Sequence, residues 1–463
     1  MDYGASGDGT TDDTAAILAA IADCPAEAAV LLPAGSYYTT ETLLLTKSIV
    51  LRGEGPSVTH IVHDHRGNAI RMESGGDWAG VEDLHIDTIY PFSDYSGEKV
   101  AFDGVQNSWI RNIETSGYIG ETIRLMGSSH CEVRDSYIHN SEAETLSVDP
   151  FRSYGIEIFG EGASHNLVEN NVLDWFRHAM ILQYLSTDNV YAYNFAWNNW
   201  TSDGGVSATT DMEFHHYNYD TNSEFVSFTL VEGNVFEQGA SNSHENNTIL
   251  RNRINNGGFS VRNNNNLIGN EFVTKKNPGT WLGNFPTNVD EGSIAHGNYV
   301  AEDSGVQWDS SINDHDIPNS YYRSSRPSWF GDLDWPPYGG DLMPGNTQRN
   351  PAEVRYWTML FPEESPSNLQ ADVSNGEVVL TWDSNSTNEV DFVICRSADN
   401  ADFHRVGYTE ETSYTDTVAE PGRYRYYVRA RNHLGGRNYQ GDLNGIDLGG
   451  ESDPSGVVTV DTE

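Results

Sequence analysis

One short stretch of the sequence, TDMEFHHYNYD at 210–220, combines carboxylates, imidazoles and phenols at alternating positions. Successive side chains of a β-strand point to opposite faces. As a strand, the stretch would therefore place four polar residues on one face: Asp211, Glu213, His215 and Tyr217. Met212 and Phe214 would occupy the other face and anchor the strand to an apolar core. The pattern predicts a surface that can bind a polymer and transfer protons, and its four polar residues are the first catalytic candidates.

Two other stretches supply further candidates. DWFRHAMILQY contains Arg177 and His178, which we add to the catalytic candidates, and SNSHENN contains a histidine beside a glutamate. We expect these stretches to lie on adjacent parts of the same surface. The residues expected to contact a substrate there are Asp174, Tyr184, Trp200, Asp203 and His244.

These residue types fit β-elimination from a uronic acid polymer. The reaction requires neutralisation of the sugar carboxylate, a base for the proton at C5 and an acid for the leaving oxygen. The candidates are Arg177, or Ca2+ held by Asp211 and Glu213, for the neutralisation; His215 or His178 for the base; and Tyr217 or Tyr184 for the acid. Ca2+ is the one cofactor that these residues suggest.

Hydrolysis is the main alternative, because it needs two carboxyl groups ~5–5.5 Å apart for retention or ~6.5–9.5 Å apart for inversion. Strands stacked ~4.8 Å apart would give the first separation between neighbours and the second between strands two apart. The available carboxylates are Asp174, Asp203, Asp211 and Glu213. The nearby histidines and arginine favour the lyase. A non-catalytic glycan-binding or surface adhesion protein is the third reading.

The composition of the whole chain narrows the choice of partners. The chain has 463 residues, a formal net charge of -42 and only four lysines. Such an acidic surface disfavours nucleic acid, whose phosphates require basic partners. The sequence contains no run of 18 apolar residues, so we expect no membrane span. We expect a polysaccharide partner and a monomeric protein, although the net charge opposes a polyuronate unless Ca2+ or local arginines offset it.

The first fifty residues predict a short helix followed by short strands. In DYGASGDGTTDDTAAILAAI, Thr11 is the expected N-cap, and an apolar stripe follows at Ile17, Leu18 and Ile21. Short β-type runs come next in VLLPAGSYY, TLLL and SIVLRGEG. A single helix before many strands is expected to cover the open end of a stacked sheet, because an exposed edge invites aggregation.

A repeat follows, in which an apolar pair precedes an Asn or Asp and a further apolar residue. Asn234, Asn252 and Asn270 are each 18 residues apart, and longer insertions separate other copies. The complete set of anchors is Asn112, Asp135, Asn171, Asn194, Asn234, Asn252, Asn270 and Asn298. Such a period predicts a parallel β-helix whose asparagines stabilise repeated turns and bond from coil to coil.

The repeat stops near residue 318. Residues 318–362 are rich in proline, glycine and aromatics, and we expect them to wrap over the C-terminal end of the β-helix and to act as a linker. In RYRYYVRARN, buried-type residues alternate with arginines, which is typical of a half-buried antiparallel strand. We predict two domains: a β-helix over 1–362 and a β-sandwich over 363–463.

These motifs resemble known families. DYGASGDGTTDDTAAILAAI with VLLPAGSYY resembles the N-terminal signature of the pectate-lyase-like, right-handed parallel β-helix superfamily. That superfamily includes polysaccharide lyases, polygalacturonase-type glycoside hydrolases, alginate epimerases and phage tailspikes. The C-terminal part, with Trp382 and YRYYVRARN, resembles a fibronectin type III domain. The resemblance implies an all-β protein that acts on polysaccharides, most simply a polysaccharide lyase.

The sequence also departs from members of that superfamily. Alginate epimerases carry an Asp-Pro-His-Glu motif, whereas this chain has Asp149-Pro150-Phe151-Arg152, and no paired-aspartate signature of polygalacturonases is recognisable. Met1 directly precedes a motif that normally lies inside a longer precursor, so we expect that a leader has been removed. We therefore expect a secreted or extracellular protein, with the periplasm as the alternative location.

Overall fold

The computed structural model covers the whole chain and divides it into two compact units, Met1–Glu353 and Val354–Glu463. The predicted boundary lay between 362 and 363. The structure describes every residue except 1–2, 91–96, 118–120, 140–152, 198–210, 216–225, 243–244, 260–263, 274–291, 302–304, 343–347, 361–363, 375–376, 387–390, 399–400, 402, 419–420, 432–451 and 463. It describes the backbone alone at 215, 238, 240–242, 256–259, 360 and 374.

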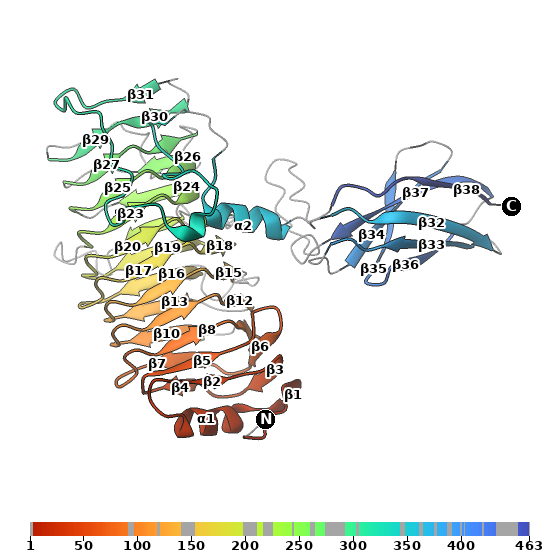
Figure 1. Ribbon diagram of the computed structural model, residues 1–463, viewed down its shortest axis with the longest axis horizontal. Coiled ribbons are helices and arrows are strands. Elements are labelled where there is room, and N and C mark those ends of the chain that lie inside the picture. The colour runs from red at the N-terminus through yellow and green to blue at the C-terminus, as the bar shows by residue number, and fades with distance from the viewer. Residues whose placement is uncertain are drawn as a thin grey trace. The chain divides into compact units, whose positions relative to one another are not determined.

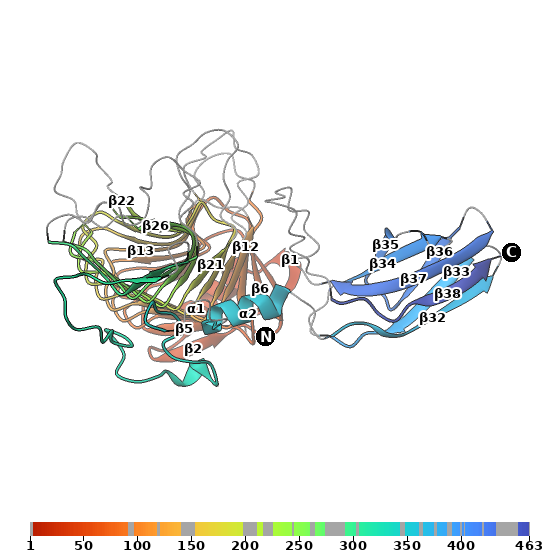
Figure 2. The same cartoon turned by 90° about the horizontal axis from the view of Figure 1, so that it is seen from above.

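The first unit is a parallel β-helix, and its coils stack from α1 to β31 (Figure 1). Most coils contain three strands, and each strand pairs in parallel with the equivalent strand of the next coil. We call the three resulting faces wall 1, wall 2 and wall 3 in the order in which the chain visits them. Viewed along the stack, the coils superimpose (Figure 2). The parallel β-helix predicted from the repeat is therefore present.

Wall 1 is an 11-stranded parallel sheet. Its strands are β2 (Ala28–Leu31), β5 (Ile49–Arg52), β8 (Gly80–Glu82), β11 (Trp109–Arg111), β14 (Glu132–Arg134), β17 (Leu167–Glu169), β20 (Val190–Ala192), β23 (Leu230–Glu232), β25 (Thr248–Leu250), β27 (Asn266–Ile268) and β29 (Ile294–His296).

Wall 2 follows in each coil. Its strands are β1 (Asp8–Asp12), β3 (Gly35–Thr39), β6 (Thr59–His63), β9 (His85–Thr88), β12 (Glu114–Gly117), β15 (Tyr137–His139), β18 (Val172–Asp174), β21 (Phe195–Trp197), β24 (Val235–Asn242), β26 (Arg253–Phe259), β28 (Glu271–Phe272), β30 (Asn298–Val300) and β31 (Gly305–Gln307). β31 pairs antiparallel with β30, whereas the other pairs are parallel.

Wall 3 closes each coil and carries the candidate site. Its strands are β4 (Leu43–Leu45), β7 (Ile70–Met72), β10 (Val100–Asp103), β13 (Glu121–Met126), β16 (Tyr154–Phe159), β19 (His178–Gln183) and β22 (Met212–His215). The long strand β24 pairs with β21 of wall 2 and with β22 of wall 3, so walls 2 and 3 are joined in one 20-stranded sheet.

The helix α1 (Thr14–Asp23) covers the N-terminal end of the core. Ile17 and Ile21 are buried in the β-helix core and Leu18 packs against it, as the predicted stripe requires. The predicted N-cap was wrong: the cap residue is Asp13, and the helix starts at Thr14. Thr11 cannot serve because it lies in β1, where its backbone N–H and its hydroxyl both donate to Asp8, at 2.7 Å and 2.8 Å.

Two successive turn positions stabilise the corner between walls 1 and 2, whereas the repeat predicted a single position. An Asn ladder runs through Asn171, Asn194, Asn234, Asn252, Asn270 and Asn298, with each side-chain amide donating to the next at 2.9–3.0 Å. Asn112 and Asp135, predicted as members, lie one residue earlier, in left-handed backbone at φ 50° and 57°. Ser136 occupies the ladder position of its coil, since its N–H donates to Asn171 at 3.1 Å. A glycine or a short polar residue suits the left-handed position, whereas the amide suits the ladder.

The segment after β31 takes a different course from the predicted wrap over the C-terminal end. It includes the short helix η2 (Ser328–Phe330) and runs back along the β-helix, as its contacts with earlier coils show. Trp335 Nε1 donates to Tyr193 Oη at 2.9 Å, and the N–H of Tyr321 donates to Glu232 at 2.9 Å. The fully buried Arg251 holds the segment through the carbonyl of Ile317 and a bidentate pair with Asp341. The helix α2 (Pro351–Leu360) follows this segment.

The second unit contains two antiparallel sheets. The strands of the first, β32 (Ser367–Ser374), β33 (Glu377–Asp383) and β36 (Ser413–Thr417), lie in that order. The strands of the second are ordered β35 (His404–Thr409), β34 (Asp391–Ala398), β37 (Gly422–Arg431) and β38 (Val458–Thr462). Tyr424, Tyr426, Val428 and Ala430 of β37 are buried in the core, as the predicted alternation requires. This is the packing of a β-sandwich.

Neither of the two α-helices described is both long and apolar enough to cross a membrane.

Candidate active site

The candidate site is built on the central strands of wall 3. In these strands the apolar residues alternate inward, and Met212 and Phe214 of β22 are buried in the β-helix core, as predicted. Glu213 lies between them and is oriented to the outer surface, with a side chain 20% exposed. The register places Glu213 beside Ile181 of β19 and Ile181 beside Glu157 of β16. The two glutamates are therefore two strands apart, ~10 Å at the backbone.

An imidazole–carboxylate pair forms at the start of β19. His178 Nε2 lies 2.9 Å from Glu213 Oε2, and the imidazole is almost fully buried. A fixed partner at one ring nitrogen of a buried histidine decides which tautomer is present. The sequence candidates His178 and Glu213 are thus brought into direct contact from neighbouring coils.

A tyrosine from the preceding coil lies against this imidazole. Tyr154 begins β16 and pairs in register with His178, with ring centroids 5.7 Å apart. The residue before it, Ser153, is fully buried and has φ 124°, a backbone conformation that side chains rarely adopt. The Ser153 carbonyl accepts the N–H groups of Arg177 and His178 at 3.1 Å and 3.3 Å. This strained residue therefore aligns the starts of the two strands and brings the phenol to the imidazole.

The local charges keep the phenol protonated. Burial raises the pKa of Tyr154 far above its ordinary value. The positive charge of Arg177 opposes part of that rise, whereas Glu213, Glu157 and Glu121 add to it. The phenol is accordingly a proton donor at neutral pH, and a guanidinium lies near enough to act on it electrostatically. Arg177 thus belongs to the same group as Tyr154, His178 and Glu213.

A second charged group continues the surface toward the N-terminus. Arg124 Nε of β13 lies 2.8 Å from Glu157 Oε2, and its Nη1 lies 3.2 Å from Glu98 Oε1. Glu157 and Glu98 are buried, and the Arg124 guanidinium also stacks over Phe159 at 4.6 Å. This arrangement keeps the Glu157 carboxylate paired with a cation.

Of the remaining predicted residues, one is buried beside β22, two lie elsewhere on the β-helix, and the others are outside the described part of the chain. Asp211 is fully buried next to Met212, and Asp174 lies on wall 2, where it accepts a hydrogen bond from Tyr137 at 3.4 Å. Tyr184 follows the far end of β19, ~20 Å along the strand from His178, and stacks on Phe159 instead. Tyr184 is therefore not the phenol of this site. Outside the described residues lie Tyr217, Trp200, Asp203 and His244, together with the side chain of His215.

Sequence reasoning missed Tyr154 and Glu157. Both lie in YGIEIF, which carries the same inward alternation as HAMILQ in the next coil. Aligning these two strands would have placed Tyr154 beside His178. The Asn anchors gave no such alignment, because the insertion between Asp135 and Asn171 was measured from the wrong turn position.

The two residues proposed for Ca2+, Asp211 and Glu213, lie two positions apart at the start of β22. Glu213 faces His178, and the Asp211 side chain is buried beneath the surface. Among the residues that the structure describes, no group of three or more His, Cys, Asp or Glu is placed to hold a metal. Ca2+ takes six to eight oxygen ligands, so two carboxylates fall short. Ca2+ binding stays a prediction, and no step below depends on it.

Comparison with known proteins identifies a family at the N-terminus. Residues 1–73 match the family described as "Rhamnogalacturonase A/epimerase, pectate lyase-like". This match and the stacked parallel coils support the resemblance to the pectate-lyase-like β-helix superfamily. A search of curated proteins finds no match. The matched segment ends at β7, before the first residue of the candidate site.

Three solved structures give a broader view. The Acinetobacter phage vB_ApiP_P1 tailspike protein is 9% identical, covering 94% of this chain and 76% of its own, with a TM-score of 0.46. The catalytic unit of a GH87 alpha-1,3-glucanase from Streptomyces thermodiastaticus is 16% identical over 59% of this chain and 53% of its own, with a TM-score of 0.38. An Fn3-like protein from Clostridium thermocellum is 25% identical over 21% of this chain and 90% of its own, with a TM-score of 0.16.

Proposed function

We propose that this protein cleaves an acidic polysaccharide by β-elimination at the centre of wall 3. The observation that carries the proposal is the convergence of a buried imidazole, a protonated phenol and a guanidinium on neighbouring strands. His178 and Tyr154 are in register, and Arg177 precedes His178 directly. β-Elimination requires these three kinds of group in one place.

Each group has a distinct role in the proposed reaction. Arg177 neutralises the sugar carboxylate, which acidifies the neighbouring C5–H. The His178 imidazole takes the C5 proton, and Glu213, whose Oε2 lies 2.9 Å from His178 Nε2, stabilises the imidazolium that forms. The electron pair of the C5–H bond forms the C4–C5 double bond, and the C4–O bond breaks. Tyr154, which its raised pKa keeps protonated, donates its proton to the leaving oxygen.

One observation favours hydrolysis as a second candidate. Glu157 and Glu213 lie on the same wall two strands apart, which allows the ~6.5–9.5 Å separation of inverting glycoside hydrolases. In that reaction Glu157, which contacts Arg124, would activate water, and Glu213 would protonate the leaving oxygen.

The two reactions are distinguished by their products. Incubation of the full chain with polygalacturonate, alginate and a panel of neutral polysaccharides is expected to give new ultraviolet absorbance from an unsaturated chain end. New reducing ends without that absorbance would replace the lyase by the hydrolase, and Glu157→Gln should then abolish them. Binding with no cleavage of any substrate would indicate a non-catalytic glycan-binding or adhesion protein.

The fold of the second unit, the location of the protein and its oligomeric state are also proposals. We propose that the second unit is a fibronectin type III domain that acts as a spacer. Its sheets of three and four antiparallel strands support this assignment. We also propose that the protein is secreted and monomeric, since its polymer substrate would lie outside the cell. The strong negative charge is compatible with a dispersed monomer.

A further inference from the structure

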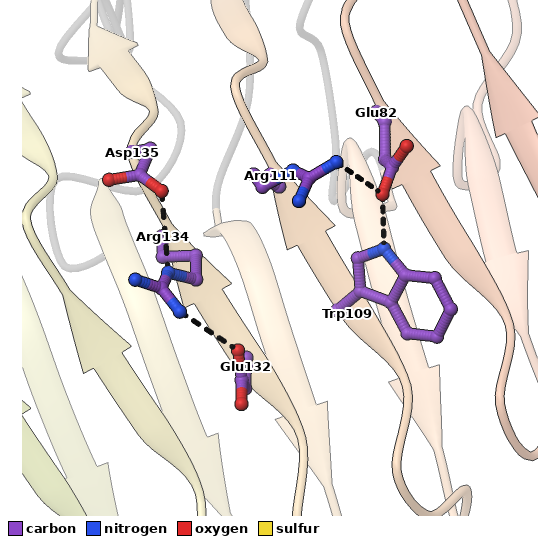
Figure 3. Close-up of a pocket in the computed structure, with 6 residues that line it drawn as sticks. All are labelled: Glu82, Trp109, Arg111, Glu132, Arg134 and Asp135. Atoms are coloured by element: carbon purple, nitrogen blue, oxygen red, sulfur yellow. Dashed lines mark hydrogen bonds and ion pairs between the residues drawn. The ribbon is translucent and has the colours of Figure 1, made fainter.

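A separate pocket lies on wall 1, on another face of the same coils. Its volume is about 350 Å³, and Figure 3 shows its lining residues projecting from neighbouring parallel strands. They are Glu82, Trp109, Arg111, Glu132, Arg134 and Asp135. That volume is in the range of small-ligand sites, which span ~300–1,000 Å³. None of these residues takes part in the reaction proposed for wall 3.

The floor of the pocket is an indole held in a fixed orientation. Trp109 pairs in register with Gly80, and a Cβ at position 80 would lie 2.5 Å from the indole ring. Only glycine allows the ring to lie this close to the sheet. Trp109 Nε1 donates to Glu82 Oε1 at 2.7 Å, which prevents rotation of the ring. Figure 3 shows the indole broad side on, with Arg111 and Glu82 beside it.

The rim of the pocket supplies charged donors and acceptors. Buried Glu82 lies 2.6 Å from Arg52 and 3.1 Å from Arg111, so two guanidiniums share one carboxylate. Arg111 is 50% exposed and keeps further N–H donors directed to solvent. In the next strand, Glu132 is 46% exposed and lies 3.5 Å from Arg134. Three arginines in one column are notable in a chain with only 26 basic residues against 68 acidic ones.

We propose that this pocket is a second, non-catalytic site that binds one pyranose ring of a polysaccharide. The flat apolar ring face stacks on the Trp109 indole, which presents a rigid amphipathic surface. Ring hydroxyls accept from Arg111 and donate to Glu132, because Arg111 lies two residues beyond Trp109 on β11 and Glu132 pairs with Trp109 on the adjacent strand β14. Two arginines, Arg52 and Arg111, surround the single carboxylate of Glu82. This arrangement favours a sugar ring that carries a carboxylate near Arg111.

The site would bind a polymer independently of its cleavage. A chain held on wall 1 stays close to wall 3 of the same molecule, which raises its local concentration at the reaction centre. The proposal therefore goes beyond the proposed reaction and requires only that a saccharide binds.

Calorimetric titration tests the proposal in a His178→Gln background, which separates binding from turnover. The probes are hexamers of galacturonate and of mannuronate, with maltohexaose as the neutral arm. We expect two binding events for at least one acidic hexamer and weaker binding of maltohexaose. Adding Trp109→Ala should remove one event or weaken it at least tenfold. Gly80→Ala should weaken the same event, because its methyl group displaces the indole.

Matched variants make the outcome decisive. Trp308→Ala removes another partly exposed indole, which stacks on His315 at a ring distance of 4.0 Å, and should leave both events unchanged. Thermal unfolding checks that each variant is folded. Unchanged titrations in folded Trp109→Ala and Gly80→Ala proteins would overturn the proposal, as would the absence of binding by every probe. Turnover of the wild-type chain is measured separately, so failure of the proposed reaction leaves this result intact.

Discussion

Walls 1 and 3 present the same backbone geometry and use their outward-facing residues differently. On wall 1 one register column reads Arg52, Glu82, Arg111, Arg134 and Glu169. Each glutamate in it is paired with arginines of the same column, at 2.6–3.1 Å. On wall 3 the equivalent column passes through Arg71, Ala101, Arg124 and Glu157 and then reaches Ile181.

That isoleucine changes the partner of the next carboxylate. Glu213 follows Ile181 in register and pairs with His178, which belongs to a different column. A column of matched charges is stable and chemically inert, since every group already has a partner of opposite charge. A break in the column allows a carboxylate to orient an imidazole. The two walls therefore differ in the partner of the carboxylate: arginines hold Glu82 and Glu169 on wall 1, whereas Glu213 on wall 3 contacts an imidazole.

The largest expected effect concerns wall 3. His178→Gln and Tyr154→Phe should each lower turnover of the polyuronate that the protein cleaves by about 10²–10⁴-fold, because each removes a proton-transfer group. Initial rates of ultraviolet absorbance measure the loss. His165→Asn is the matched control, since His165 is exposed in left-handed backbone, which asparagine tolerates. Full activity of either site variant would remove the group from the mechanism.

The buried imidazole of His63 differs from that of His178, because its ring nitrogens contact a hydroxyl and a carbonyl and not a carboxylate. His63 of wall 2 contacts the Thr39 hydroxyl at 3.1 Å and the Gly67 carbonyl at 3.2 Å, and burial lowers its pKa to about 4. An unfolded histidine titrates near ~6.5. As the pH falls from ~6.5 to ~4, the unfolded chain binds a proton that the folded chain does not, so stability falls.

The size of this loss follows from the shift in pKa. The advantage in free energy of unfolding of the wild type over His63→Gln should shrink by about 3 kcal/mol between pH 7 and pH 4. Urea unfolding at the two pH values measures it. A constant difference between the two proteins would mean that His63 titrates normally in the folded state.

On wall 1 the ion pairs are expected to contribute to stability. Glu82→Gln keeps the acceptor for Trp109 but removes the charge shared by Arg52 and Arg111, and should lower the free energy of unfolding by about 2 kcal/mol. The half-exposed arginines keep the loss below that of a fully buried pair. Glu132→Gln, at an exposed ion pair, should change it by less than about 1 kcal/mol. Equal effects of the two variants would contradict the ladder as a source of stability.

The smallest expected effect is that of the second unit. Deletion of residues 365–463 should leave the rate on soluble polysaccharide nearly unchanged, because the described site residues all belong to the first unit. The assay is the same absorbance measurement, made beside the full chain. Complete loss of activity in a folded, truncated protein would show that the second unit contributes to catalysis.

The sequence could predict the fold from local patterns. Alternation in TDMEFHH placed Met212 and Phe214 in the core, and the recurring asparagines indicated coils with a ladder at one corner. The stripe of Ile17 and Ile21 located the capping helix. Each of these features depends on neighbours within one strand, one turn or one helix, so period and residue type are sufficient.

The site required knowledge of how distant strands align. Tyr154 meets His178, and Ile181 separates Glu157 from Glu213, only because the coils stack in a particular register. Tyr184 was one of two phenols predicted as the acid, yet the extended strand β19 carries it away from His178. The return of residues 308–350 to Tyr193 and Glu232 was equally hidden, since it depends on long-range hydrogen bonds.

The amino-acid sequence by itself thus determined a stack of parallel coils with a polar outer surface and a separate sandwich. Tertiary structure alone decided which outward side chains became neighbours. The physical reason is that side-chain alternation is set within each strand, whereas register between coils depends on insertions whose length and course the repeat does not specify.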